Sequence, residues 1–182
     1  MQPKFALLTG LVLCVSLSAC QTTGGYKDVS DKLPALDVKL ASAPWNGHTV
    51  PNEGICVDHG GKGFAPEIVV NNIPAEATAI IVEFSDRNYS PMNGGGHGVI
   101  GFPVKPGATS VKLPSIPGYT SELPDGIWVK SHNRSTGKGY RGPCSGGRHN
   151  IYEADIKAVQ EPQKQGEEGK LFATGRVRLG TY

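Results

Sequence analysis

The sequence lacks the motifs that mark most enzymes and most nucleic-acid-binding proteins. It contains no Gly-x-Ser-x-Gly, no His-Glu-x-x-His and no Gly-Lys-Ser/Thr, so the common serine hydrolases, zinc peptidases and P-loop proteins have no counterpart here. No Cys-x-x-Cys pair is present, which leaves a metal site weakly supported. The formal net charge of +2 gives no reason to expect nucleic acid as a partner. We therefore expect no catalysis, no cofactor and no metal.

Long apolar runs are also missing, except at the N-terminus. Lys4 precedes an uncharged, mostly apolar stretch over residues 5–17, and Ser18-Ala19 leads into Cys20. This is the layout of a secretory signal, and the apolar run falls short of the roughly 20 residues that a membrane span needs. The junction resembles the lipobox of bacterial lipoproteins, in which the cysteine is acylated and becomes the N-terminus. An ordinary cleaved signal with an incidental cysteine is the alternative.

The residue after that cysteine is Gln21 rather than Asp. By resemblance to the sorting rules of bacterial lipoproteins, this favours the outer membrane as the location of the protein. We expect a lipid-anchored protein of the bacterial cell envelope that faces the periplasm. The chain then divides into a signal peptide (1–19), a polar, flexible tether (20–36) and one domain (37–182).

Helix signals are almost absent from that domain, whereas turn residues are abundant, with 25 Gly and 14 Pro in the chain. The segment 160–170 has helix-favouring residues, but Pro162, Gly166 and Gly169 interrupt it. The sequence therefore predicts a mainly β protein, an antiparallel sandwich or barrel with long Gly/Pro loops and few helices.

Several segments are typical of strands, and one of them alternates cleanly. In residues 150–159, Tyr152, Ala154, Ile156 and Ala158 would share one face of a strand. The other expected strands lie at 37–40, 67–74, 77–84, 99–104, 127–129 and 174–179.

Two cysteines remain once Cys14 leaves with the signal and Cys20 carries lipid. Cys56 and Cys144 form an even pair in a compartment where disulfides persist, and we expect a disulfide between them. Two free thiols or half of a metal site are the alternatives.

Two histidines stand beside glycines immediately before expected strands. His97 follows Gly94-Gly95-Gly96, and His149 follows Gly146-Gly147-Arg148. Such positions can line the mouth of a site, and the glycines would leave N–H groups available to an anion. The alternative is that the glycines only make turns and each histidine is a surface residue.

Four blocks of sequence, in order, resemble the phosphatidylethanolamine-binding family in its bacterial Raf-kinase-inhibitor-like branch. They are Cys56-Val57-Asp58 with Gly63 to Pro74, then Ile80 to Asp86 leading to His97, then Gly139-Tyr140-Arg141-Gly142-Pro143-Cys144, and Gly147-Arg148-His149. The chain end Arg178 to Tyr182 also looks like the family's L-V-G-T-Y ending. The Gly-Tyr-x-Gly-Pro-Cys block is the specific one.

The resemblance implies a β-sandwich with Greek-key connections and a small pocket for an anionic ligand, such as phosphate or a phospholipid headgroup. The ligand-binding residues it implies are Asp86, His97, Tyr140, Pro143 and His149, with Asp86 orienting one imidazole. It also implies that the loops bearing the two cysteines converge on the pocket.

The sequence departs from the family pattern in several places. Gly98 replaces a tryptophan, and Asn150 and Ile151 stand where the family has Arg and an aromatic residue. A helix often found after the penultimate strand is expected to be lost here. Two other classes of function are alternatives to ligand binding: a protease-inhibitor-like protein, and an enzyme on phosphorylated or acylated small molecules with Asp86 and His97 as an acid–base pair. The departures add a further alternative, a relic pocket that serves only as a scaffold for an unknown protein partner.

Replacing Cys20 with Ala should move the protein from the membrane fraction to the soluble fraction, because the acyl chains are the expected anchor. Cys14→Ala is the matched control and should stay membrane-bound, since Cys14 belongs to the removed signal. A Cys20→Ala protein that remains in the membrane fraction would contradict the assignment.

Overall fold

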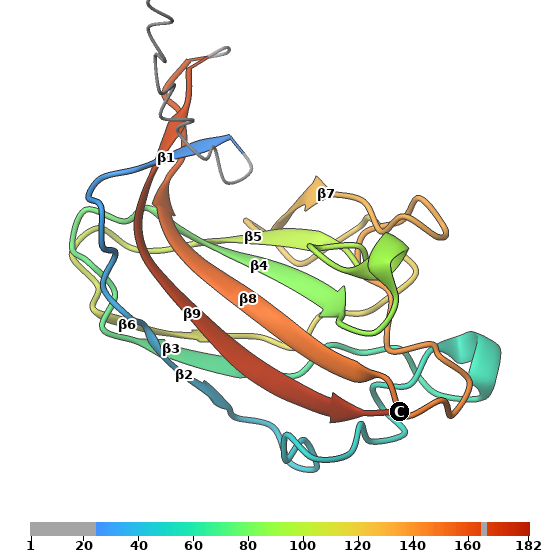
Figure 1. Cartoon of the computed structure of the whole chain (residues 1–182). Coiled ribbons are helices and arrows are strands. Elements are labelled where there is room, and N and C mark those ends of the chain that lie inside the picture. The colour runs from blue at the N-terminus through green and yellow to red at the C-terminus, as the bar shows by residue number, and fades with distance from the viewer. Residues whose placement is uncertain (1–24, 165–166) are drawn as a thin grey trace, which may run out of the picture.

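Two β-sheets packed face to face make up the computed structural model (Figure 1), which describes residues 25–164 and 167–182. The expected signal peptide and Cys20 lie outside the described residues. The strands, in chain order, are β1 (Tyr26–Asp28), β2 (Asp37–Leu40), β3 (Ile68–Asn71), β4 (Ala79–Asp86), β5 (Val99–Pro103), β6 (Ser110–Leu113), β7 (Trp128–Ser131), β8 (Ile151–Gln160) and β9 (Gly169–Thr181). Helical structure in the described part is limited to two 3₁₀ turns, η1 (Val57–His59) and η2 (Ser90–Met92). The expectation of a mainly β fold is confirmed.

One sheet has six strands in the order β1-β9-β8-β4-β5-β7, and the other has three in the order β2-β3-β6. All neighbours pair antiparallel except β1 and β9, which run parallel. The larger sheet is therefore mixed, a detail the sequence did not reveal. Strand β8 returns through a long connection to lie beside β4, which gives the spatial order β8-β4-β5-β7, and the chain passes through β6 of the other sheet between β5 and β7.

The core lies between the two sheets and follows from the alternation of side chains along β8. Tyr152, Ala154, Ile156 and Ala158 are all buried there, as the spacing of two residues predicts. They pack against inward side chains of β4 and β3.

Strand β4 is apolar on both faces, and both faces are covered. Ile80, Val82 and Phe84 belong to the core between the sheets, whereas Ile81 packs on the outer face of the larger sheet in a second cluster. That cluster also contains Tyr26 of β1. The unbroken Ala-Ile-Ile-Val run of β4 thus reflects burial on two sides rather than alternation.

Part of the segment expected as a tether is ordered on the sheet. Tyr26 is only 2% exposed, and residues 26–28 pair with residues 169–171 at the start of β9. Leu36 is buried in the main core. The packed part of the chain thus begins before residue 37, because residues 26–28 pair in parallel with β9, more than 140 residues away along the chain.

Two further elements were not expected from the sequence. Strand β6 is only four residues long and pairs with β3. Strand β9 begins at Gly169, within the segment whose composition favoured a broken helix. No helix in residues 25–164 and 167–182 is long and apolar enough to cross a membrane.

Replacing Tyr26 with Ala should lower the free energy of unfolding by about 3 kcal/mol, because it removes a buried aromatic ring. Tyr26→Phe keeps the ring and loses only the hydroxyl that donates to Glu161, which should cost about 1 kcal/mol. Chemical denaturation measures both, and equal losses would show that packing of the ring does not hold β1.

Candidate functional site

A polar cavity of about 450 Å³ opens at the end of the sandwich where β4 ends and β8 begins. Two long loops complete its walls: the one after β4, which contains η2, and the one before β8. Its lining residues are Asp86, Asn88, Tyr89, Met92, His97, Arg141, Cys144, Ser145, Arg148, Asn150 and Tyr152. Two of the five residues expected to bind ligand, Asp86 and His97, are among them.

Asp86 is a buried carboxylate whose oxygens are all engaged. It is 3% exposed, and Oδ1 accepts the backbone N–H groups of Asn88 (2.9 Å) and Tyr89 (3.1 Å). Oδ2 accepts Nδ2–H of Asn150 at 2.7 Å. This arrangement caps the turn after β4 and supplies the hydrogen bonds that a buried charge requires.

His97 is held by the backbone of the loop before β8. Its backbone carbonyl accepts the N–H of Arg141, and its Nδ1 lies 2.9 Å from the carbonyl oxygen of Arg141. Since a carbonyl can only accept, Nδ1 carries the proton in the neutral ring. The ring stands edge-on to Tyr152, with centroids 5.3 Å apart. Asp86 was expected to orient an imidazole; instead the Arg141 carbonyl orients His97, and Asp86 bonds to Asn150.

Burial lowers the pKa of His97 below its ordinary value, although the Arg141 carbonyl and the Asp86 charge oppose this. The uncharged imidazole is thus the resting form near neutral pH. A second N–H, able to donate to an anion, forms only when the ring takes up a proton.

His149 does not line the cavity, contrary to its expected role. It is exposed and lies in the left-handed region at φ 59°. The next residue, Asn150, lines the cavity instead, and its side-chain amide donates to Asp86.

Tyr152 completes this wall. Its hydroxyl accepts the backbone N–H of Cys144 at 3.1 Å. Burial raises the pKa of Tyr152 to about 12, so the phenol is neutral at physiological pH.

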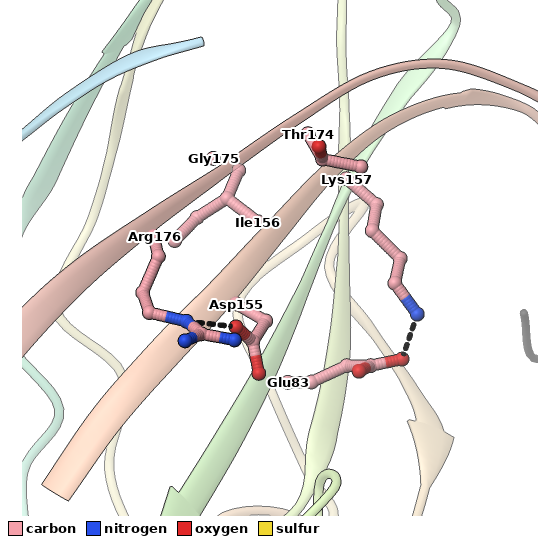
Figure 2. Close-up of a pocket in the computed structure, with 7 residues that line it drawn as sticks. All are labelled: Glu83, Asp155, Ile156, Lys157, Thr174, Gly175 and Arg176. Carbon is pink, nitrogen blue, oxygen red and sulfur yellow. Dashed lines mark hydrogen bonds and ion pairs between the residues drawn. The ribbon is translucent and has the colours of Figure 1, made fainter. Parts of the chain in front are cut away.

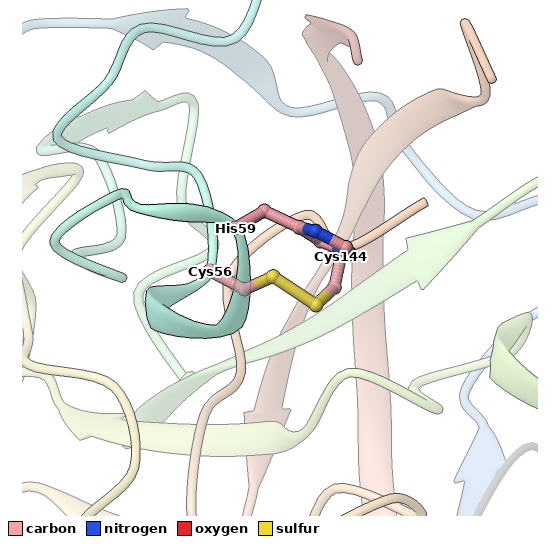
Figure 3. Close-up of side chains that lie close together, drawn as sticks. All are labelled: Cys56, His59 and Cys144. Carbon is pink, nitrogen blue, oxygen red and sulfur yellow. A yellow bond between two sulfur atoms is a disulfide. The ribbon is translucent and has the colours of Figure 1, made fainter. Parts of the chain in front are cut away.

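The cysteine pair lies at the rim of the cavity and forms the expected disulfide, with Cα atoms 5.2 Å apart. His59 stands beside the two sulfurs (Figure 3), and the three possible ligand atoms are within 4.8 Å of one another. The S–S bond occupies both sulfurs, so the oxidised protein presents no thiolate to a metal.

Arg141 connects this rim to the loop of η1. Its guanidinium donates to Asp58 at 2.6 Å and lies 3.0 Å from Cys144 Sγ. Its hydrogen bonds are largely satisfied within the protein. Arg148, by contrast, is exposed and donates one N–H to the Ser145 carbonyl, which leaves further donors of its guanidinium for a ligand.

In the glycine-rich segment around His97, three backbone N–H groups are used by hydrogen bonds within the protein. Those of Gly94, Gly95 and Gly98 bond to Asn93 Oδ1, Ser85 Oγ and the Gly95 carbonyl. Arg134 adds hydrogen bonds to three carbonyls of this loop, each at 3.0 Å. These glycines shape the turn, whereas His97 itself is buried and is not the surface residue of the simpler interpretation.

A second, shallower hollow of about 520 Å³ lies on the outer face of β4, β8 and β9 (Figure 2). Its charges pair with one another: Arg176 with Asp155, and Lys157 with Glu83. Since these ion pairs already neutralise one another within the sheet face, the polar cavity is the better candidate site.

Comparison with models of protein families and with curated proteins gave no match to this sequence. Two solved structures do resemble it. Escherichia coli YbcL, described as a member of the mammalian phosphatidylethanolamine-binding protein (PEBP) family, shares 17% identity over 81% of this chain and 97% of its own, with a TM-score of 0.56. Chlamydia trachomatis CT736, described as a PEBP homologue, shares 18% identity over the same proportions, with a TM-score of 0.50.

The fold is PEBP-like. Identities this low show the fold alone, and the binding properties of the two proteins do not carry over with it.

Tyr140 and Pro143 lie behind the wall of the polar cavity rather than in it. Both are buried and border a small internal gap next to His97 and Tyr152. The ring of Tyr140 packs on Phe84 with centroids 4.5 Å apart, and its hydroxyl has no hydrogen-bond partner in the described structure. These two residues support the site from the core.

A steric constraint explains why residue 98 is a glycine. Its φ is 116°, and a Cβ would come within 2.5 Å of the Gly139 carbonyl oxygen. The close approach of the two loops in this PEBP-like domain therefore requires glycine.

The depressed pKa of His97 makes folding stability depend on pH. Below about pH 6.5 His97 binds a proton in the unfolded chain but stays neutral in the folded protein. The free energy of unfolding should therefore decrease as the pH falls below about 6.5, by at most about 1.4 kcal/mol per pH unit. Above about pH 6.5 both forms are neutral and this contribution vanishes.

Urea denaturation of wild type and His97→Asn at several pH values tests this, since the variant should lose that part of the slope. The exposed His149→Ala serves as the control and should keep it. Identical slopes in wild type and His97→Asn would contradict the assignment.

Proposed function

We propose that this protein is a lipid-anchored envelope protein whose PEBP-like domain binds a small anionic ligand, of phosphate or phospholipid-headgroup type, without catalysis. The observation that carries the proposal is the polar cavity in which a buried carboxylate, an amide, an imidazole and an exposed guanidinium converge. The placement in the envelope rests on the N-terminal sequence up to Cys20.

The cavity offers both signs of charge at different depths. Asp86 lies buried at its base and Arg148 is exposed at its edge. A ligand with a phosphate group can pair with the guanidinium, and a ligand that also carries an ammonium group, such as phosphoethanolamine, can place that group toward the carboxylate. Asn150 and Tyr152 line the same cavity and supply polar groups that fix orientation.

Binding rather than turnover is supported by how Asp86 and His97 are engaged. In an Asp–His pair of the catalytic-triad kind, the carboxylate bonds directly to the imidazole and orients it. Here Asp86 accepts from Asn150 and from two backbone N–H groups, and His97 is oriented by a backbone carbonyl. These contacts make a rigid polar wall.

Calorimetric titration of phosphate and of phosphoethanolamine tests the proposal. Wild type should bind both. Binding should tighten as pH falls below about 6.5, because protonated His97 gains a second donor. Since the pKa of His97 is lowered, most of the gain should appear in the more acidic part of this range.

Asn150→Ala and Arg148→Ala should each weaken binding about tenfold, since a hydrogen bond to a charged group contributes about 1.5–3 kcal/mol. His149→Ala is the matched control and should bind like wild type, because His149 does not line the cavity. Absence of binding heat in these titrations, or equal affinity of wild type and all three variants, would contradict the proposal and favour a relic pocket that binds no ligand.

A further inference from the structure

The chain enters the domain at the end opposite to the cavity. The Gly25 carbonyl accepts the N–H of Gly169 at 3.1 Å, and Tyr26 pairs with Gly169 at the start of β9. The cavity lies at the other end of the same strands, where Asp86 faces Tyr152 in the register of β4 and β8. Figure 1 shows β1 at the top of the molecule and the end of β9 near the bottom.

The length of strand β8 and the length of the chain from Cys20 to Gly25 limit the orientations that an anchored domain can adopt on a membrane. From Tyr152 to Gln160, whose register partner is Lys170 beside β1, strand β8 extends roughly 26 Å at about 3.3 Å per residue. The chain from Cys20 to Gly25 can span at most about 18 Å in any conformation. With lipid on Cys20, a domain turned so that the cavity faces its own membrane would hold Gly25 beyond that reach.

Strand β1 is what keeps this connection short. The Tyr26 ring is buried and lies under Lys130 Nζ at 4.5 Å, and the next residue past the strand, Val29, donates its N–H to the Leu171 carbonyl at 3.1 Å. If β1 and Val29 detached, the next fixed point would be Pro34, whose carbonyl accepts the N–H of Thr174 at 3.1 Å. The free connection would then reach at most about 50 Å, enough to turn the domain over.

We propose that docked β1 orients the anchored domain so that the cavity opens away from the membrane that carries it. The cavity is then supplied with phosphate-type ligands from the aqueous compartment or from a facing surface, and the headgroups of its own leaflet are excluded. This inference rests on the proposed function, since it needs both the lipid on Cys20 and a binding cavity.

The orientation is tested with the full lipidated protein in phosphatidylcholine vesicles that contain a headgroup-labelled acceptor lipid. A fluorescent residue is placed either at Tyr89, on the exposed rim of the cavity, or at Val29, beside β1. Energy transfer to the membrane should be lower from Tyr89 than from Val29. Inserting about twelve Gly/Ser residues before Gly25 adds up to about 40 Å of reach and should abolish this difference. Equal transfer from both positions without the insertion, or an unchanged difference with it, would overturn the inference.

The source of ligand is tested by titrating soluble phosphoethanolamine into the unlabelled anchored protein. Phosphatidylethanolamine in the protein's own vesicles should leave the apparent Kd unchanged in wild type and raise it severalfold in the insertion variant. A raised Kd in wild type would overturn the inference. Competition from added protein-free phosphatidylethanolamine vesicles would identify headgroups of a facing surface as ligand, and no competition would identify the free anion.

The two proposals fail in different ways. If the cavity binds nothing, soluble phosphoethanolamine gives no heat even in detergent, whereas the energy-transfer result is unaffected. If the orientation is wrong, phosphoethanolamine still binds and the difference between Tyr89 and Val29 is absent.

Discussion

The antiparallel pairing of β4 with β8 is the constraint on which the rest of the molecule depends. Eight consecutive residue pairs, from Ala79 opposite Val159 to Asp86 opposite Tyr152, fix the two strands in one register. A slip by one residue would turn Ile80, Val82 and Phe84 out of the core. The same register places Asp86 next to the residues that precede β8. The pairing of β4 with β8 therefore determines both the packing of the core and the assembly of the polar cavity.

The polar cluster at the end of this pair explains why the surrounding loops are held so firmly. A carboxylate as buried as Asp86 is tolerated only with its hydrogen bonds made, and it obtains them from the turn after β4 and from Asn150. His97 and Arg141 join two further loops, because the Arg141 N–H donates to the His97 carbonyl and the His97 imidazole bonds to the Arg141 carbonyl. The Cys56–Cys144 bond ties the η1 loop to the same place. Separate loops thus share one set of constraints around one cavity.

Regular strand patterns and the cysteine pair could be predicted from the sequence, because each depends on local spacing or on simple pairing. The alternation of β8 gave its buried face correctly. The residue just before β8 that lines the cavity is Asn150. The resemblance to the family motif predicted His149 instead, because the Gly-Arg-His block contains the histidine of that motif and Asn150 matches no residue of it.

Other features could not be found this way. Strand β1 is three residues long, has a single large apolar side chain and owes its order to distant β9. The depressed pKa of His97 and the engagement of the glycine N–H groups depend on neighbours that only the folded chain assembles.

The position of β9 has a consequence for the timing of folding. This last strand pairs with both β8 and β1, and bridges further to residues 35 and 49 near the start of the domain. Contacts between the two ends of a chain form slowly and need the whole chain. Until the final residues have emerged, β8 lacks one neighbour and β1 lacks its only one in the sheet. If the chain is exported unfolded, as the proposed envelope location requires, the larger sheet cannot be completed before β9 has crossed the membrane.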